Sequence, residues 1–330
     1  MRINIHIGHY VCKPTSNYDY CRKKSSEKSE MVSVVGGGAW GRALTKHISQ
    51  KSNVQLVCRN PDAATKDQGY EIIDLAHFNG AEDIIYTAVS SAFCEVMKPI
   101  IEMTMPKNIL IASKGFVLDE DGTSLFYHDW LSNMGFTGSF GILSRPSFAS
   151  EINTVGCTCL NLATTSDKLF KRFNLLLNHH SVSIIRSHDY LGVEIAGAFK
   201  NMVAILVGWL DVKANGGANT RFALIVKALR ELEQILESQG GNVSTVYDYA
   251  GVGDLMLTCL NHQSRNWRFG QLLGSGLTKD QALQRISTVE GLNALGHFNS
   301  MDYQSPLIDL IKKVVDRKVG VDTVLEYVSN

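Results

Sequence analysis

The sequence has no excess of charge of either sign, because its 32 lysines and arginines match its 32 aspartates and glutamates. Composition therefore gives no argument for a nucleic-acid or anionic-membrane partner, both of which favour a basic surface. A small substrate is the default expectation. With 330 residues, 45% of them hydrophobic and 19% charged, the chain reads as an ordinary globular protein of two domains.

The sequence also lacks the cysteine patterns of a disulfide framework or a zinc site. Its seven cysteines are an odd number, include no C-x-x-C pair and accompany no histidine cluster at zinc spacing. This predicts a reducing compartment and no structural metal. Cys157 and Cys159 are expected on one face of a strand, where core packing explains them better than metal binding, because two such cysteines make at most half a metal site.

A long apolar segment is absent from residues 1–30, which are basic and polar, so they do not resemble a secretory signal. Met31 stands directly before the first predicted strand. We therefore expect residues 1–30 to be a disordered basic tail, or else a misassigned start with Met31 as the initiator. Acidic residues in this segment disfavour a transit peptide.

A glycine-rich turn follows the first apolar run, Met31–Val35, and a helical pattern begins directly after it. Gly36, Gly38 and Gly41 fit G-x-G-x-x-G, in which the glycines allow a tight turn, backbone approach to a pyrophosphate and helix–strand packing. Backbone N–H groups at the helix start would face the phosphates. Because a predicted strand precedes the turn and a predicted helix follows it, the turn indicates a dinucleotide-binding unit.

The second predicted strand, Val54–Cys58, is followed by Arg59, which lies 21 residues past Gly38. An acidic residue at this place would hold the ribose hydroxyls of NAD, whereas an arginine accommodates the 2′-phosphate of NADP. Arg59 thus indicates that NADP is at least tolerated. A solvated arginine at a strand end is the equally weighted alternative.

Strands and helices continue to alternate up to residue 186, which predicts an α/β fold with a Rossmann-type, mostly parallel sheet over residues 31–186. The further strands are Ile84–Val89, Asn108–Ala112, Phe140–Leu143, Thr158–Ala163 and Val182–Ile185, and the helices are Ala92–Thr104, Thr123–Met134 and Asp167–Leu177. Ligands of such sheets lie beyond the carboxyl ends of the strands. Lys114 follows one of these ends and is a candidate for holding an anionic or carbonyl ligand, with a solvated loop lysine as the alternative.

Only helical patterns follow, which predicts an all-α substrate domain over residues 187–330. The expected elements are helices Leu191–Val212 and Asn219–Ser238, a short helix Asn242–Tyr249, a tight turn Gly251–Leu255, a helix from a Thr278–Gln281 capping box through Ile286, and a helix starting at Ser305-Pro306.

Lys200 interrupts the apolar Leu191–Val212 helix near its middle. A buried lysine needs a partner or a task, because desolvation disfavours its charged form, and such a lysine can donate and accept a proton. The alternative is an ordinary core helix whose lysine reaches water with its end. A membrane span is disfavoured, because Glu194, Lys200 and Asp211 would each be unfavourable in lipid.

Seven segments occur together in an order and spacing that resembles the NAD(P)-dependent glycerol-3-phosphate dehydrogenases. They read GGGAWG, SKG, SRPSFASE, GVEIAGAFKN, GVGDLMLTC, QSRN and TVEG, and the resemblance runs from Met31 to near the C-terminus. It implies a Rossmann domain followed by an all-helical substrate domain, with NAD or NADP as cofactor. It further implies a cytoplasmic homodimer that reduces dihydroxyacetone phosphate to sn-glycerol 3-phosphate for phospholipid synthesis.

The resemblance also implies roles for individual residues. Lys200 would be the proton donor in reduction, with Lys114 and Asp254 as further catalytic residues. Substrate-binding positions are Lys114, Ser147, Asp254, Ser264, Arg265 and Asn266. Cofactor-binding positions are Gly36, Gly38, Ala39, Trp40, Gly41, Arg59, Lys114, Ala149, Arg265, Thr288 and Glu290. The alternative interpretations are that Asp254 only caps a turn and that Arg265 only pairs with Glu290.

Three departures from the family keep other readings open. Arg145 replaces a glycine before Pro-Ser-Phe-Ala, residues 61–81 are short and lack a Tyr-Leu-Pro-Gly loop, and Val-Ser-Ser at 89–91 replaces Val-Pro-Ser. They motivate a degenerate relative that binds NAD(P) without turnover. A β-hydroxyacid or 6-phosphogluconate type dehydrogenase is the other alternative. It places asparagine a helical turn after its lysine, where this chain has Ala204, and so fits less well.

Overall fold

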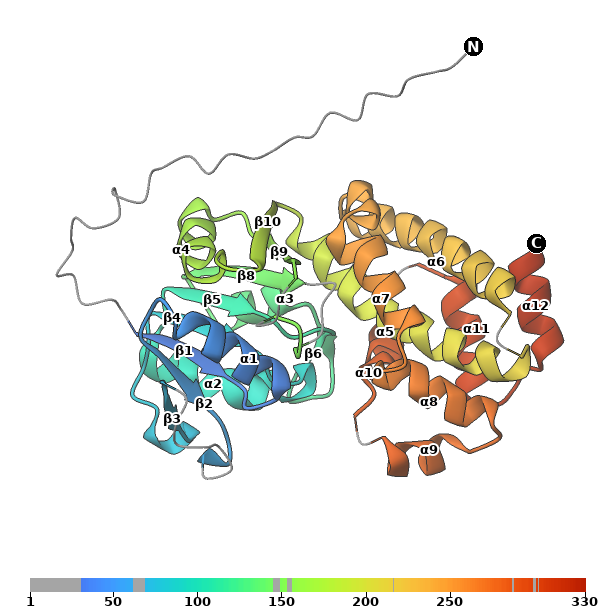
Figure 1. Cartoon of the computed structure of the whole chain (residues 1–330), viewed down its shortest axis with the longest axis horizontal. Helices are drawn as coiled ribbons and strands as arrows, with labels where there is room; N and C mark the ends of the chain where they lie inside the picture. The colour runs from blue at the N-terminus through green and yellow to red at the C-terminus, as the bar shows by residue number, and fades with distance from the viewer. Residues whose placement is uncertain are drawn as a thin grey trace, which may run out of the picture.

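The computed structural model describes residues 31–61, 69–144, 149–152, 156–215, 217–286, 288–298, 301 and 303–330. The expectations for residues 1–30, Arg145 and Ser147 lie outside these residues. Figure 1 shows a sheet-containing part formed by the chain up to Ser187, beside a helical part formed by the residues after it.

Eight strands of the described chain form one sheet, in the order β10-β9-β8-β5-β4-β1-β2-β3. Neighbouring strands are parallel except for β8 and β9, which pair antiparallel. The strands are β1 Val32–Val35, β2 Val54–Val57, β3 Glu71–Ile73, β4 Asp83–Tyr86, β5 Asn108–Ile111, β8 Ser139–Ser144, β9 Thr158–Ala163 and β10 Val182–Ser187; β6 Val117–Leu118 and β7 Ser124–Leu125 form a separate antiparallel pair.

Helices cover both faces of this sheet, which explains why its strands are nearly continuous apolar runs. The helices are α1 Ala39–Ile48, α2 Phe93–Thr104, α3 Tyr127–Asn133 and α4 Asp167–Leu177. Val34 packs with side chains of α1 and α4, whereas its neighbour Val35 packs with side chains of α2 and α3. Successive strand residues thus contribute to two hydrophobic cores, one on each face of the sheet. The ends of the strands lie outside these cores, where a ligand can reach the loops that follow them.

The helical part is built around α5, Tyr190–Lys213, which is buried from Gly192 to Leu210. Figure 1 shows α5 running from the sheet into the midst of the other helices. These are α6 Ala218–Gln239, η5 Val243–Tyr247, the π-helix η6 Tyr249–Gly253, α7 Asp254–Leu260, α8 Arg265–Gly274, α9 Lys279–Arg285, α10 Glu290–Phe298, α11 Pro306–Val315 and α12 Val321–Ser329. Because neighbours surround α5, its apolar residues are needed on every side.

By length and composition α5 could cross a membrane, and 94% of its most apolar window is buried inside the protein. Its apolar character therefore reflects a central core helix. Glycines bring α8 against it, since a Cβ built on Gly208 would stand 2.0 Å from the carbonyl oxygen of Trp267 and one on Gly270 would stand 2.0 Å from that of Ile205. The two helices touch backbone to backbone at these positions.

Most predicted elements are found with ends shifted by a few residues, and three interpretations need correction. Gly251–Leu255 is not a tight turn, because η6 leads directly into α7 there. The expected helix Thr123–Met134 begins only at Tyr127, since β7 occupies Ser124–Leu125. Cys157 and Cys159 are not core residues: β9 starts at Thr158, Cys157 is exposed and Cys159 is only partly buried.

Candidate functional site

The glycine turn after β1 has the geometry that the fingerprint requires. Gly36 has φ +126°, and a Cβ there would lie 2.6 Å from the Ala88 nitrogen; one on Gly41 would lie 1.8 Å from the Gly36 carbonyl oxygen. By contrast, a Cβ on Gly38 would have no heavy atom of the described chain within 4 Å. Gly36 and Gly41 therefore serve the turn and the packing of α1, while Gly38 opens to space that a ligand can approach.

The start of α1 offers backbone donors beside this open space. Gly38 is its N-cap and gives the helix no side-chain cap from the described residues, while Ala39 in the first turn is exposed. The first N–H groups of a helix lack intrahelical acceptors, so they suit an anion such as a pyrophosphate. Trp40 is 7% exposed and packs into the core below α1.

Arg59 lies at the same edge of the sheet. The Gly36 nitrogen donates to the Val57 carbonyl oxygen at 2.9 Å, so the turn after β1 and the end of β2 are adjacent. Arg59 follows two residues later and is exposed. An exposed guanidinium beside the glycine turn is placed to pair with a phosphate on the ribose end of a dinucleotide.

The loops after β4 and β5 continue this edge toward the helical part. A Cβ on Gly115, where φ is +106°, would lie 2.9 Å from the Ser90 hydroxyl. Lys114, one residue earlier, runs along α5, and its Cγ lies 3.9 Å from the position of a Cβ on Gly197. The carboxyl edge of the sheet is thereby joined to α5.

Lys114, Lys200 and Asp254 meet at this junction, although they are far apart in the sequence. Lys114 Nζ lies 2.6 Å from Asp254 Oδ2, and Lys200 Nζ forms an ion pair with Asp254 Oδ1. Lys200 is 4% exposed and Asp254 is 1% exposed, whereas the Lys114 side chain retains 16%. Two ammonium groups thus share one buried carboxylate, and this ion pairing compensates the desolvation of Lys200.

Thr258 completes the surroundings of Lys200. Lys200 Nζ donates to Thr258 Oγ1 at 3.0 Å, and the Thr258 hydroxyl donates to the Asp254 carbonyl oxygen at 2.6 Å. Burial alone would raise the pKa of Asp254, but Lys114 and Lys200 outweigh it and hold the pKa below 3.8. Asp254 is therefore an anion at neutral pH, and two of the three Lys200 N–H bonds are directed by fixed acceptors.

A second polar cluster lies beside Lys200. Asn201 accepts from Asn266 Nδ2 at 2.9 Å and donates to Glu290 Oε2 at 3.3 Å, and Asn266 Oδ1 accepts from the Gly291 nitrogen at 3.0 Å. These bonds tie α5, α8 and α10 together. Arg265 Nη2 stands 3.9 Å from Glu290 Oε1, a long contact that leaves 47% of the arginine side chain exposed. The expected pairing of Arg265 with Glu290 is present, and the exposed N–H groups of the guanidinium can still donate hydrogen bonds to a ligand.

The remaining expected residues lie nearby or outside the described chain. Ser264 is the N-cap of α8, accepting from the Trp267 nitrogen at 3.3 Å, and so sets the direction in which Arg265 leaves the helix. Thr288 and Ala149 are partly buried, and Ala149 packs against the core that includes Trp40. Ser147 lies outside the described residues.

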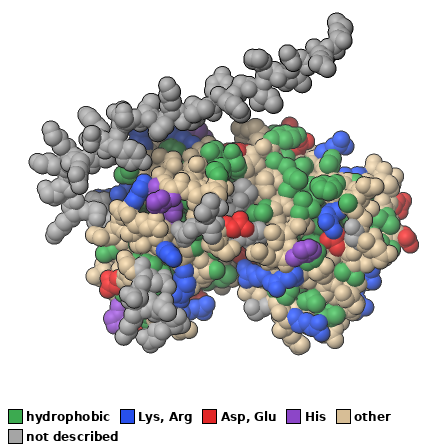
Figure 2. All heavy atoms as spheres, in the orientation of Figure 1, with side chains coloured by type: hydrophobic (Ala, Val, Ile, Leu, Met, Phe, Trp, Pro, Cys, Tyr) green, Lys and Arg blue, Asp and Glu red, His purple; other side chains and the backbone are tan. Residues whose placement is uncertain are grey.

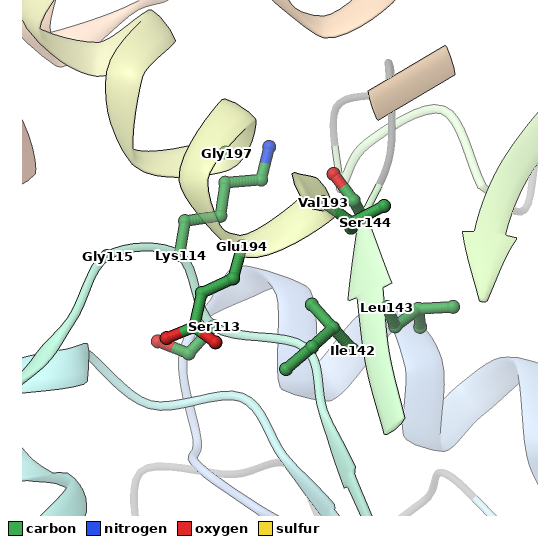
Figure 3. A pocket seen from close by; sticks show the side chains of 9 residues that line it. All are labelled: Ser113, Lys114, Gly115, Ile142, Leu143, Ser144, Val193, Glu194 and Gly197. Carbon is green, nitrogen blue, oxygen red and sulfur yellow. The ribbon is translucent and has the colours of Figure 1, made fainter. Parts of the chain in front are cut away.

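A small buried cavity separates the Lys114 loop from α5. It has room for about one water molecule and is lined by Ser113, Ser144 and Glu194 among others. Figure 3 shows the Glu194 carboxyl group beside Ser113, while the Lys114 ammonium group points away from them, past Gly197. Burial raises the pKa of Glu194 well above 4.5, which favours the protonated form of this carboxyl group.

Two residues that organise the site, Thr258 and Asn201, have no role predicted from the sequence. Thr258 had a usable signal, because it follows Asp254 by four residues and so shares its helix face. Asn201 was visible only as the neighbour of Lys200. Its contacts with α8 and α10 depend on tertiary packing and could not be derived from spacing.

The surface around these residues can accept an extended anionic ligand. Figure 2 shows the molecule hollowed between its two parts, with lysine and arginine side chains on both sides of the hollow. The open Gly38, the uncapped α1 and the exposed Arg59 fit the phosphate-bearing part of a dinucleotide. The Lys114–Asp254–Lys200 cluster lies at the other end of the same strand edge, where the reacting group of such a ligand would reach.

Comparisons with known proteins find relatives over most of the chain. Residues 189–326 match the model of the NAD-dependent glycerol-3-phosphate dehydrogenase C-terminus. A glycerol-3-phosphate dehydrogenase [NAD(P)+] of Pseudomonas entomophila is 32% identical over 288 residues, which is 81% of this chain and 83% of that protein. One from Ruthia magnifica is 30% identical over 318 residues, 91% of this chain and 97% of its own.

A solved structure supports the same conclusion. The glycerol-3-phosphate dehydrogenase of Coxiella burnetii matches with a TM-score of 0.81 and 25% identity, covering 92% of this chain and 99% of that one. The resemblance inferred from the seven sequence segments is thus confirmed over nearly the whole described chain. The chain belongs to the family of NAD(P)-dependent glycerol-3-phosphate dehydrogenases.

Proposed function

We propose that this chain reduces dihydroxyacetone phosphate to sn-glycerol 3-phosphate with NADH or NADPH. One observation carries the proposal: Lys200 and Lys114 converge on the single carboxylate of Asp254 at the carboxyl edge of a dinucleotide-type sheet. Buried ionisable clusters of this kind are typical of catalytic sites. The substrate is inferred from the relatives, which are glycerol-3-phosphate dehydrogenases. The cluster contains groups that can stabilise and protonate the oxygen of a ketone during its reduction.

The proposed cofactor site follows the edge from Gly38 to Lys114. Gly38 and the α1 amide groups would hold the pyrophosphate, with Gly36, Ala39, Trp40 and Gly41 forming the turn around it. Arg59 would pair with a 2′-phosphate, so we propose that NADPH is accepted as well as NADH. Ala149, Arg265, Thr288 and Glu290 complete the proposed contacts with the nicotinamide end. When bound, the cofactor supplies the hydride that reaches the ketone carbon.

Lys200 is the proposed proton donor. Two of its N–H bonds point to Asp254 Oδ1 and Thr258 Oγ1, and among the described residues the third has no partner. As negative charge develops on the ketone oxygen, that third N–H would stabilise it and then transfer a proton from Nζ. Asp254 would keep the orientation of Nζ throughout, because both of its oxygens are held by lysines.

We propose that the substrate phosphate is bound on the α8 side of the site. The planar guanidinium of Arg265 can donate two parallel hydrogen bonds to phosphate oxygens, and Asn266 and Ser264 flank it at the start of α8. Lys114 would add a second cation toward the substrate carbonyl group. Ser147 remains a proposed further contact.

Several broader expectations belong with this proposal. We propose a domain boundary near residue 187, dividing a dinucleotide-binding domain at 31–186 from a substrate domain at 187–330, because β10 ends at Ser187 and α5 starts at Tyr190. We also propose a homodimer in the cytoplasm whose product enters glycerophospholipid synthesis, as the resemblance implies.

The test is the loss of reduced nicotinamide absorbance with dihydroxyacetone phosphate, using NADH and NADPH in parallel. We expect turnover in the wild type and a fall in kcat of about 100-fold or more in Lys200→Met, the range of a lost general acid. Lys213→Met, in the last turn of the same helix and exposed, is the matched control and should retain full activity.

Cofactor binding separates this proposal from the alternative of a non-catalytic NAD(P)-binding relative. Both variants should bind NADPH as tightly as the wild type, measured by fluorescence titration. Binding without turnover in the wild type itself would favour the non-catalytic alternative. Undiminished turnover in Lys200→Met would remove Lys200 from the mechanism.

A further inference from the structure

Cys157 and Cys159 form a surface dithiol that the proposed reaction does not use. Their sulfur atoms lie 3.9 Å apart, at the point where β9 begins. Cys157 is exposed and Cys159 is partly exposed, whereas Cys94 and Cys259 are buried. Core packing therefore does not account for the pair, and both thiols are accessible together from solvent.

The separation of the two sulfur atoms matches that of two thiolates on one metal ion. Zinc-type ions bind thiolates at about 2.3 Å in tetrahedral geometry, which places the two sulfur atoms about 3.8 Å apart. A disulfide instead requires about 2.05 Å and would need the two sulfur atoms to move together by nearly half their separation. Bridging by a cation thus needs little movement of either cysteine.

We propose that Cys157 and Cys159 bind one thiophilic d10 cation, of the Zn²⁺ or Cd²⁺ type, through both sulfur atoms. On binding, two S–H bonds break and their protons pass to solvent. Two metal–sulfur bonds form and replace two water ligands of the ion. No electrons are transferred. No group of three or more His, Cys, Asp or Glu able to hold a metal occurs among the described residues. The proposed site therefore has two protein ligands, and water would occupy the other positions of a tetrahedral ion.

Tyr249 gives the pair a second anchor in the helical part. Its side chain interacts with the Cys159 thiol. Asp248, the preceding residue, accepts from Asn161 Nδ2 at 3.0 Å and so fixes the π-helix against β9. The π-helix therefore lies beside the start of β9, where the two cysteines are.

The test is a Cd²⁺ titration of the full chain, followed by the sulfur-to-cadmium charge-transfer absorbance and by proton release into a weak buffer. We expect one equivalent with two thiolates and about two protons released. Cys157→Ser and Cys159→Ser should each weaken this binding tenfold or more, and the double variant should abolish it. Cys58→Ser, which removes a partly buried thiol elsewhere, is the matched control and should leave it unchanged.

Either of two results would overturn the proposal. One is a single serine variant that binds Cd²⁺ as tightly as the wild type, and the other is a double variant that binds Cd²⁺ with the stoichiometry and affinity of the wild type. Because both sites of substitution are at the surface, we expect circular dichroism and thermal melting to show folded variants. Turnover is not part of the readout, so the outcome is independent of the proposed function.

Discussion

The carboxylate of Asp254 compensates the positive charge of two lysine ammonium groups, Lys114 and Lys200, at a site that is largely shielded from water. Its carboxylate is 1% exposed and contacts Lys200 and Lys114 through different oxygens. The sequence indicated Lys200 because a lysine in an apolar helix needs a partner, and the structure supplies that partner from a helix 54 residues later. The arrangement fixes the direction of the Lys200 ammonium group through two acceptors, Asp254 and Thr258.

The role of Thr258 can be tested without disturbing packing. Thr258→Val keeps the shape of the side chain but removes the acceptor of Lys200 Nζ and the donor to the Asp254 carbonyl oxygen. We expect kcat to fall about tenfold, since a hydrogen bond to a charged group contributes about 1.5–3 kcal/mol and part of it can be replaced by water. Steady-state kinetics measure this change. Thr258→Ser should retain activity, and equal losses in both variants would contradict a role for the hydroxyl.

Glu194 makes the stability depend on pH. Its Oε1 accepts from the Tyr127 nitrogen at 2.9 Å, and burial raises its pKa well above 4.5. Glu194 stabilises the fold fully at pH values below its pKa in the unfolded chain, and this contribution is lost as pH rises toward its pKa in the folded protein. Between these two pKa values the free energy of unfolding decreases by up to about 1.4 kcal/mol per pH unit. Glu194→Gln keeps the acceptor and does not titrate.

Urea unfolding of both proteins at pH 5 and pH 8 measures the predicted difference. Glu194→Gln should gain stability relative to the wild type as pH rises. A stability difference that stays constant between the two pH values would show that Glu194 does not titrate on unfolding.

At the scale of elements, the sequence predicted those whose residues carry a local pattern. Helix α5 was expected at Leu191–Val212 and spans Tyr190–Lys213, and the capping box of α9 is present at Thr278. The edge strand β3 and the β6–β7 pair were missed, because strands of two or three residues depend on partners distant in sequence. The π-helix η6 was interpreted as a turn, since Gly251 reflects close packing against the Thr245 carbonyl oxygen, which the sequence does not show.

The contact between α5 and α8 depends on a glycine in each helix. In Gly270→Ala the added Cβ would stand 2.0 Å from the Ile205 carbonyl oxygen, a backbone atom that cannot rotate away. We expect Gly270→Ala to lower the free energy of unfolding by about 2 kcal/mol or more, because the helices must separate. Thermal or urea unfolding provides the measurement.

Gly296→Ala is the matched control, since it also changes a helical glycine to alanine. Gly296 lies within α10, and its Cβ would meet no described heavy atom within 4 Å. Alanine is the better helix former by about 1 kcal/mol, so this variant should be as stable as the wild type or more so. If both variants lost stability equally, close packing at Gly270 would not be the cause.

At the scale of the whole molecule, the site exists only where the two parts meet. Sequence spacing placed Lys114 at a strand end and Lys200 in a helix, but only the resemblance suggested that they act together. Their meeting at Asp254 depends on how α5 leaves β10 and on how α7 follows η6. Neither angle is encoded in a local pattern, which explains why the geometry of the site could not be derived from spacing.

The contacts of Asp254 should also stabilise the junction of the two parts, and the geometry predicts which substitution lowers the free energy of unfolding more. Asp254→Asn leaves two ammonium groups near one another without their carboxylate, so we expect a loss of about 3–5 kcal/mol in the free energy of unfolding at pH 7. Lys114→Met should lose less, because Asp254 keeps Lys200 as its partner and Lys114 is the more exposed of the two lysines.

Acid should remove the difference between Asp254→Asn and the wild type. The folded pKa of Asp254 lies below 3.8, so its stabilising contribution is present above that value and is lost as pH falls through the folded pKa. Urea unfolding at pH 7 and at successively lower pH would follow this convergence below about pH 4. A larger loss in Lys114→Met than in Asp254→Asn would mean that Lys114, and not the shared carboxylate, couples the sheet to the helical part.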